Sequence, residues 1–209
     1  MEVQFFGANA LRLTSKKASL VIDDNLAELG VKSITKEGDI ALFTAAQHPL
    51  PSVDVKQMID YPGEYEVSGV SIRGVAARAH TDEANQKSAV IYKFTVEDLR
   101  VVVLGHIYPD LSEEQLEALG TTDVLFVPIG GNGYTLDSIG ALKLIRKIEP
   151  KLVIPTHFDN AKLNFPVPQT PLAEALKNMS LEPADTVERL KIKSAELPEA
   201  MQLIVLQNS

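Results

Sequence analysis

The order of short strand-like segments and amphipathic helices is the feature that most restricts the fold of this chain. In the first half, short apolar or alternating runs are separated by turn-forming residues, which is typical of β-strands. Nine strands are predicted, at Val3–Phe6, Ala10–Thr14, Ser19–Asp23, Asp39–Thr44, Gln57–Asp60, Glu64–Val67, Val70–Ala77, Ala89–Thr95 and Arg100–Leu104. The first three indicate a meander. The later ones favour an antiparallel set, with Tyr61-Pro62-Gly63 as a turn.

After residue 110 the pattern changes to alternating strands and helices. Ser112 followed by acidic residues is typical of a helix start, and Gly120 ends that helix. The other predicted elements are strands at Asp123–Val127, Lys151–Pro155, Val187–Ile192 and Gln202–Leu206 and helices at Leu136–Ile148 and Pro171–Met179. Together the two halves predict a single α/β domain over residues 1–209, a β-sandwich with helices packed on its outer faces. The proline-rich stretch Phe165–Pro171 predicts an extended surface loop.

Charge and hydropathy restrict the partners of the chain. The formal net charge is −8, so its long-range field disfavours binding to a nucleic-acid backbone or an anionic membrane surface. No stretch approaches the ~20 apolar residues that a membrane-spanning helix needs, and the first residues lack the pattern of a secretory signal. We therefore expect a cytoplasmic protein whose partner is a small molecule.

The absence of cysteine limits any metal site to His, Asp and Glu ligands. Of the four histidines, three follow predicted strands, namely His80, His106 and His157. Strand ends bring loops together at the rim of a sheet, so these imidazoles are candidate ligands for one zinc or other divalent ion with an open position for water. A single histidine at a strand end is more often a structural residue.

Two further features have both a functional and a plain interpretation. The turn at residues 130–133 (GGNG) lies between a strand and a helix, where it forms either a tight connection or an anion site. Asp23 ends a strand, where it either forms a turn or accepts a hydrogen bond from a histidine. No G-x-S-x-G nucleophile motif is present.

Several segments resemble the metallo-β-lactamase superfamily, and within it the zinc-dependent hydrolases that include the L-ascorbate-6-phosphate lactonases. The matching segments are LVIDD at Leu20–Asp24, PGEYEVSGVSIRGV at Pro62–Val75, TTDVLFVPIGGNGYTLDSIGAL at Thr121–Leu142 and KLVIPTHFD at Lys151–Asp159. The resemblance spans residues 3–159. It implies an αββα sandwich, and it implies that His80 and His157 stand at positions of metal ligands.

The sequence departs from that family where most metal ligands are expected. The family has H-x-H-x-D-H after a strand that ends in Thr, which here is Thr44. Four ligand positions carry other residues, namely Ala45, Gln47, Pro49 and Leu50. His48 is one step out of register and would point the opposite way on an extended chain. His106 stands where the resemblance implies a bridging aspartate.

These departures lead to alternative hypotheses. The first is a divergent family member without the usual dinuclear zinc site, non-catalytic or strongly altered. The second is a mononuclear metal-dependent hydrolase, with His80, His106 and His157 as ligands and Asp110 or Asp159 in support, acting on a small ester, lactone or phosphoester through metal-activated water. A third is metal-free catalysis with His106 or His157 as general base.

Overall fold

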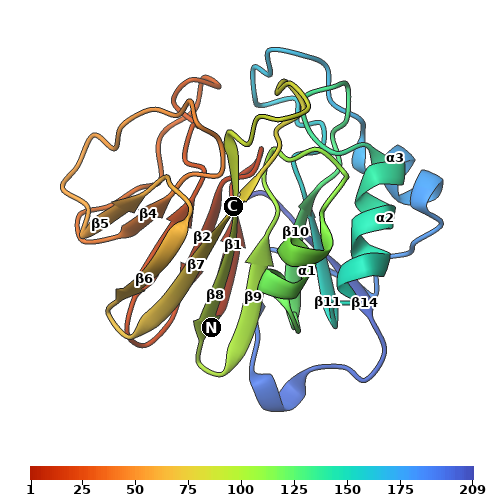
Figure 1. Ribbon diagram of the computed structural model, residues 1–209. Helices are drawn as coiled ribbons and strands as arrows, with labels where there is room; N and C mark the ends of the chain where they lie inside the picture. Colours follow the sequence, from red (N-terminus) through yellow and green to blue (C-terminus); the bar gives the residue numbers. More distant parts are fainter.

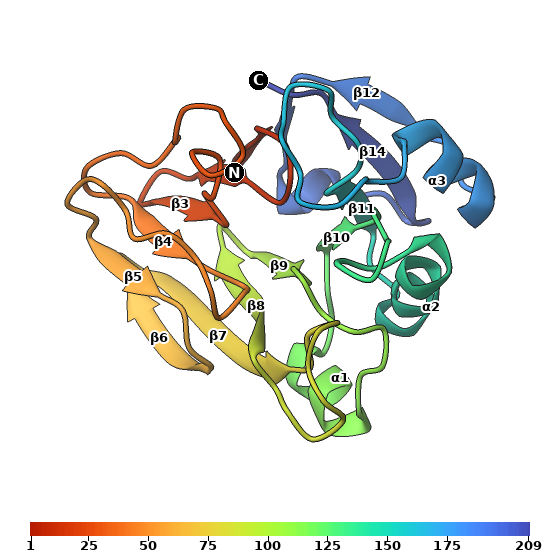
Figure 2. The same ribbon diagram turned by 90° about the horizontal axis from the view of Figure 1, so that it is seen from above.

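The computed structural model describes residues 1–209, which form two β-sheets packed face to face (Figures 1 and 2). The first sheet has six strands in the order β13 (Arg189–Lys191), β1 (Glu2–Phe5), β2 (Leu11–Thr14), β3 (Ser19–Ile22), β4 (Ile40–Leu42) and β5 (Gln57–Ile59). The second has eight, in the order β12 (Asp185–Val187), β14 (Gln202–Leu206), β11 (Leu152–Thr156), β10 (Val124–Pro128), β9 (Leu99–Val103), β8 (Ala89–Val96), β7 (Val70–Ala77) and β6 (Gly63–Val67). The helices are α1 (Glu113–Leu119), α2 (Ser138–Ile148) and α3 (Leu172–Met179), and a 3₁₀ turn covers Ser194–Glu196. None of these helices combines the length and apolar character needed to span a bilayer.

Two apolar layers hold the sandwich together. The larger cluster, of 26 buried residues, fills the space between the sheets and includes Phe5, Tyr92 and Phe126. A second cluster, of 22 buried residues, lies between the eight-stranded sheet and the helices. Strands β10 and β11 are buried along their whole length because they are covered on both faces, as their continuous apolar sequences predict. The predicted α/β sandwich is confirmed.

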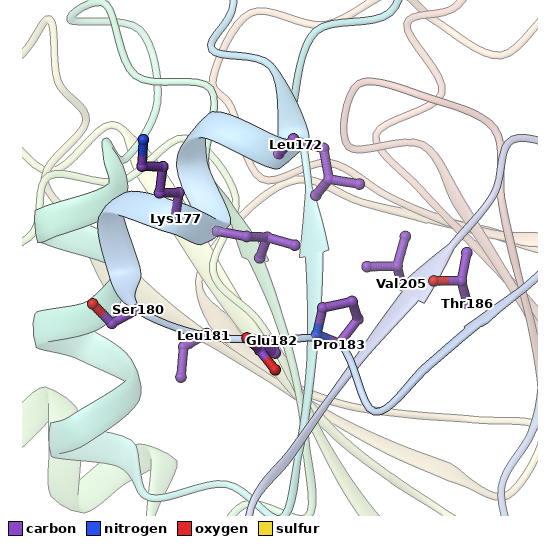
Figure 3. Close-up of a pocket in the computed structure, with 10 residues that line it drawn as sticks. Leu172, Lys177, Ser180, Leu181, Glu182, Pro183, Thr186 and Val205 are labelled. Carbon is purple, nitrogen blue, oxygen red and sulfur yellow. The ribbon is translucent and has the colours of Figure 1, made fainter.

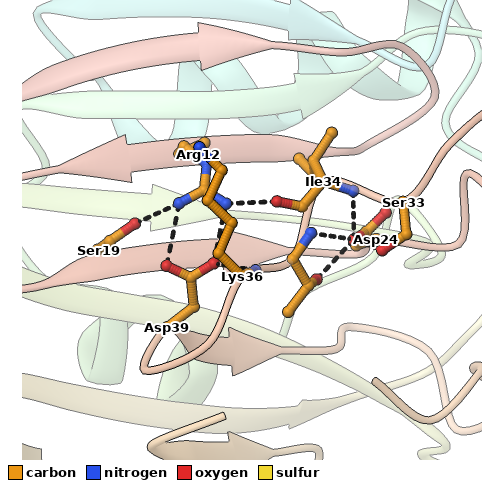
Figure 4. A network of polar contacts seen from close by, with 8 residues as sticks. Arg12, Ser19, Asp24, Ser33, Ile34, Lys36 and Asp39 are labelled. Atoms are coloured by element: carbon orange, nitrogen blue, oxygen red, sulfur yellow. Dashed lines mark hydrogen bonds and ion pairs between the residues drawn. The ribbon is translucent and has the colours of Figure 1, made fainter. Parts of the chain in front are cut away.

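The helices, however, cover only one outer face. Figure 2 shows α1, α2 and α3 outside the eight-stranded sheet, whereas an irregular loop, residues 23–39, covers part of the six-stranded sheet. Arg12 lies between two core-facing leucines of β2 and therefore points outward, where it bonds both oxygens of Asp39 at 3.0 and 2.8 Å and the carbonyl of Ile34. Asp24 accepts hydrogen bonds from this loop, including one from Ser33 Oγ at 2.6 Å (Figure 4). A polar network thus replaces the expected outer helix on this side.

Two predicted strands that follow each other along the chain belong to different sheets. Strand β5 pairs in parallel with β4, whereas β6 pairs antiparallel with β7, so the turn at Tyr61-Pro62-Gly63 crosses between sheets instead of closing a hairpin. The predicted strand Val187–Ile192 is also divided, because β12 joins β14 and β13 joins β1. Alternating polarity identifies a strand but leaves its pairing partner open, which is why the antiparallel pairing expected for β5 and the single strand expected at Val187–Ile192 were wrong.

Candidate functional site

The loops at one end of the strands enclose a cavity of about 420 Å³. It is lined by Ala45, Ala46, Gln47, Ala79, His80, Thr81, Asp82, Ser88, His106 and Tyr134. These residues come from the segments that follow β4, β7, β9 and β10, together with the start of β8. The cavity therefore lies at the rim where the carboxyl ends of neighbouring strands meet, as the histidine positions predict.

Two of the three candidate histidines are in contact in this region. Parallel pairing of β10 with both β9 and β11 brings the ends of these strands together, so that His106, after β9, lies beside His157, after β11. Their Nε2 atoms are 3.2 Å apart and their rings are nearly perpendicular, at 86°. Both side chains are buried. Tyr134 packs on both rings, with centroids 5.2 Å from His106 and 5.6 Å from His157.

His157 is held by backbone and side-chain contacts. Its N–H donates to Ala8 O at 2.6 Å, and its φ of 54° lies in the left-handed region, which non-glycine residues rarely adopt. Its Nδ1 lies 3.0 Å from Gln169 Oε1, while Gln169 Nε2 donates to Val167 O at 2.9 Å. Because Gln169 Oε1 can only accept, Nδ1 of His157 carries the proton and its Nε2 carries a lone pair.

A chain of hydrogen bonds on the opposite side supports His106. Thr44 Oγ1 donates to Asp23 Oδ2 at 2.5 Å, and its lone pair faces His106 Nδ1 at 3.4 Å. Asp23 also accepts from Thr44 N at 2.6 Å and from Asn9 Nδ2 at 2.6 Å. The 3.4 Å separation between Thr44 Oγ1 and His106 Nδ1 is long for a hydrogen bond, so the shorter Nε2 contact places the proton of His106. Because His157 Nε2 carries a lone pair, His106 Nε2 donates to it at 3.2 Å.

Burial controls the ionisation of His106, His157 and Asp23. Burial, followed by repulsion from His80, lowers the pKa of His106 to about 4. Burial, followed by repulsion from His106, lowers the pKa of His157 to about 3. Burial also raises the pKa of Asp23, against the three hydrogen bonds that favour its charged form. At neutral pH both imidazoles are therefore neutral, which is the form that binds a metal ion or accepts a proton.

His80 lies in the same cavity and makes no hydrogen bond to the pair through its Nε2. An antiparallel bridge between Ala79 and Ile107 makes His80 and His106 the next opposed positions. The His80 ring packs edge-on against Tyr108, and its Nε2 is buried without a hydrogen-bond partner. Burial lowers its pKa. Nowhere does the structure bring three His, Asp or Glu side chains together closely enough to share one metal ion.

Of the three carboxylates predicted to support the histidines, Asp23 lies near the histidine pair and the other two lie at the surface. Asp23 lies behind His106, through Thr44. Asp110 instead is exposed and lies 3.4 Å from Lys143 Nζ, and Asp159 is exposed at the surface. Neither makes a hydrogen bond to a histidine, because both lie in loops that turn their side chains to solvent.

The remaining polar motifs have structural contacts. His48 stacks on Phe43, with centroids 3.9 Å apart, and its Nε2 lies 3.2 Å from Asp60 Oδ2, away from the histidine pair. In the turn at residues 130–133, Thr170 donates to Gly130 O through both N and Oγ1, at 2.9 Å each. Asp137 caps the helix that follows by accepting from Gly140 N. This supports the interpretation as a tight connection.

Three supporting residues are absent from the sequence-based prediction. Asn9 joins Asp23 to Thr156, whose Oγ1 donates to Asn9 Oδ1 at 2.6 Å. Gln169 is 6% exposed although it belongs to Phe165–Pro171, predicted as a surface loop. Alternate residues of that stretch face inward, and the Phe165 ring lies 5.3 Å from that of His157. Tyr134 is the third, and no spacing in the sequence marks any of them.

A known protein family matches most of the chain. Residues 2–157 match the model of the family described as beta-lactamase superfamily domain. The chain belongs to the beta-lactamase superfamily. No curated protein sequence matches this superfamily member.

Solved structures of the metallo-β-lactamase fold match nearly the whole chain. A candidate zinc-dependent hydrolase from Thermotoga maritima is 25% identical with a TM-score of 0.79, and the alignment covers 99% of this chain and 98% of that one. A candidate metal-dependent hydrolase from Parabacteroides distasonis is 19% identical, with a TM-score of 0.67 and coverage of 98% and 93%. The metallo hydrolase Igni18 from Ignicoccus hospitalis is 16% identical, with a TM-score of 0.65 and coverage of 100% and 95%.

Proposed function

We propose that this protein keeps the metallo-β-lactamase scaffold without its dinuclear metal centre and binds a small polar molecule in the histidine cavity. The observation that carries this proposal is the composition of the cavity wall. Ala45 and Gln47 line it where the family resemblance predicts histidine ligands. Metal affinity depends on the number and charge of the ligands, so the loss of these positions argues against the ancestral chemistry.

Most groups that face the cavity are uncharged and suit hydrogen bonding to a neutral ligand, and its one carboxylate, Asp82, already accepts hydrogen bonds from Ala79 and Ser88. Gln47 and Thr81 supply uncharged donors and acceptors, and His80 Nε2 is buried without a partner. A buried polar atom without a partner costs free energy that a ligand hydrogen bond recovers. The alanines leave room above the histidine pair, which supports a role of the pair as the floor of a ligand site.

The experiment is a zinc titration of purified, chelator-treated protein by isothermal calorimetry, with metal content measured before treatment. We expect sub-stoichiometric metal in the purified protein and weak zinc binding. Stoichiometric, tightly bound zinc would overturn the proposal. His106→Gln is the informative variant, because it removes an imidazole that lines the cavity and keeps an amide of similar length in its place.

A mononuclear metal-dependent hydrolase is the second candidate, and the histidine pair favours it. Two nitrogen ligands of one tetrahedral zinc lie ~3.3 Å apart, close to the 3.2 Å between the Nε2 atoms of His106 and His157. Nδ1 of His157 bonds Gln169 Oε1 at 3.0 Å, and Nδ1 of His106 lies 3.4 Å from Thr44 Oγ1, so outer contacts orient both rings, as ligand histidines require. His80 would be the third ligand, after a shift of its ring. A bound ion would supply Lewis acidity for hydrolysis of a small ester, lactone or phosphoester, in line with the lactonase resemblance.

Zinc-dependent turnover of such substrates decides between the candidates. Hydrolysis that a chelator abolishes and zinc restores, and that is lost in His80→Gln, would support the second candidate. Equal activity of the wild type with and without chelator would exclude it. Ligand binding that persists in the presence of chelator supports the first.

A further inference from the structure

A second cluster of polar side chains lies on the helix-bearing face of the eight-stranded sheet. Strands β7 and β8 pair antiparallel, so that Arg73 stands opposite Lys93 and Ser71 opposite Thr95. These four side chains share one face of the sheet, because the residues that alternate with them are in the inter-sheet core. They line a cavity of about 250 Å³, which we call the basic pocket. Glu64 of β6, Ile72 of β7 and Ala118 of α1 complete its wall.

The two cations of the basic pocket have little counter-charge. Like charges directly opposite each other on neighbouring strands destabilise a sheet. Arg73 Nε lies 3.7 Å from Glu64 Oε1, but both side chains are at least half exposed, so this ion pair is weak. Lys93 Nζ donates to the carbonyl of Leu119 at the end of α1 and has no carboxylate partner. A chain with a net charge of −8 thus places two cations side by side, with the exposed Arg73–Glu64 ion pair as their one carboxylate contact.

The surroundings of Lys93 are accordingly unfavourable for its charge. Partial burial, followed by repulsion from Arg100 and Arg73, lowers the pKa of Lys93. Arg100 stands opposite Thr95 on β9 and is bound by Asp123, at 2.8 and 2.7 Å. The carboxylate of Asp123 therefore partly neutralises Arg100, whereas Arg73 and Lys93 have less counter-charge and are the cations that can attract an anion.

The next row of the sheet adds neutral donors. The hydroxyls of Ser71 and Thr95 are exposed and make no hydrogen bond to another part of the chain. A guanidinium fork, an ammonium group and two hydroxyls thus converge on one cavity. Oxyanions such as phosphate and sulfate present several acceptor oxygens to such a set of donors. Glu64 at the rim is the one group that opposes an anion.

We propose that the basic pocket binds a phosphate-type oxyanion, either free or as the terminal group of a small molecule. The site is separate from the histidine cavity, since Arg73 lies near the start of β7 and His80 follows its end. It is thus an anion site in addition to the proposed function and independent of it.

The test is calorimetric titration of the full chain with inorganic phosphate and with sulfate, at ionic strength held constant with sodium chloride. We expect saturable binding by the wild type and a loss of about tenfold or more in affinity for Arg73→Gln, because a charge-assisted contact is removed. Arg189→Gln is the matched control. Arg189 is also exposed and lies 3.8 Å from a glutamate, Glu2, but on the other sheet. No binding by the wild type, or equal loss in both variants, would overturn the proposal.

Two further variants separate anion binding from a general charge effect. Glu64→Gln should tighten phosphate binding, because it removes the opposing carboxylate. Thr95→Val should weaken it at unchanged net charge, and its thermal midpoint shows whether the sheet is intact. An intact Thr95→Val protein with wild-type affinity contradicts the assigned contacts. Glycerol phosphate distinguishes the two sources: tighter binding than inorganic phosphate indicates a phosphomonoester, and equal binding indicates the free ion.

Discussion

His106 Nε2 donates a hydrogen bond to His157 Nε2 across 3.2 Å, within a pair of buried imidazoles. The direction follows from Gln169, whose Oε1 accepts the Nδ1 proton of His157 and leaves a lone pair on its Nε2. Burial lowers the pKa of both rings and keeps them neutral at neutral pH. Neutral imidazole is the form that binds a metal ion or accepts a proton.

Substitution of Gln169 should change the tautomer of His157. In Gln169→Leu the buried Nδ1–H loses its acceptor, which costs about 1–3 kcal/mol of unfolding free energy and frees the proton to move to Nε2. Gln169→Glu keeps an acceptor and adds a negative charge, which should raise the pKa of His157. Imidazole nitrogen chemical shifts measured by NMR report both effects. Unchanged shifts for His157 in Gln169→Leu would show that this contact does not set the tautomer.

The stability of the chelator-treated protein should depend on pH through the same pair. The pKa values of His106 and His157, about 4 and about 3, lie below the ordinary value of 6.5, so between these limits the unfolded chain binds more protons. The free energy of unfolding is therefore fully present above pH 6.5 and falls as the pH drops towards 4, by at most ~1.4 kcal/mol per pH unit for each histidine. Urea unfolding at several pH values measures this slope. His157→Gln should reduce it; an unaltered slope would contradict the assignment.

Gly105 lies so close to Thr44 that no side chain should fit at position 105. Gly105 has φ +63°, and a Cβ added there would lie 2.2 Å from Thr44 Oγ1. Gly105→Ala should cost about 2–4 kcal/mol and displace the hydroxyl that supports His106. Gly133→Ala is the control, because Gly133 has φ +71° but nothing within 4 Å of an added Cβ. Gly133→Ala reports the backbone strain alone, whereas Gly105→Ala adds the clash with Thr44, so Gly105→Ala should unfold at the lower temperature. Equal thermal midpoints would show that the clash costs nothing.

Local sequence patterns predicted most strands and helices and both histidines of the contacting pair. Apolar runs identify buried strands such as β10 and β11, and His106 and His157 follow strands that lie on either side of β10. The resemblance to a known family added the prediction that Ala45 and Gln47 stand where the family has metal ligands. What it could not predict is which side chains support the pair.

The supporting residues were missed because their contacts are distant along the chain and are made by flexible polar side chains. Asn9 bonds Thr156 across 147 positions, and the Gln169 contact depends on one inward position in a loop rich in proline. Sheet membership of β5 and β6 escaped prediction for a similar reason, since pairing depends on the whole fold. The sequence pattern thus predicts where histidines meet, and only the tertiary structure gives their protonation.

Histidines placed in the cavity wall at positions 45 and 47 should raise the metal affinity of the protein. Ala45 and Gln47 both line the cavity, beside His106. The double variant Ala45→His and Gln47→His should therefore bind zinc at least about tenfold more tightly than the wild type, equivalent to ~1.4 kcal/mol. Competition with a chromophoric chelator measures this change. Ser52→His adds an imidazole at an exposed position of the same loop and should leave zinc affinity unchanged. If the double variant and Ser52→His gain equally, the cavity wall is not the position from which metal ligands were lost.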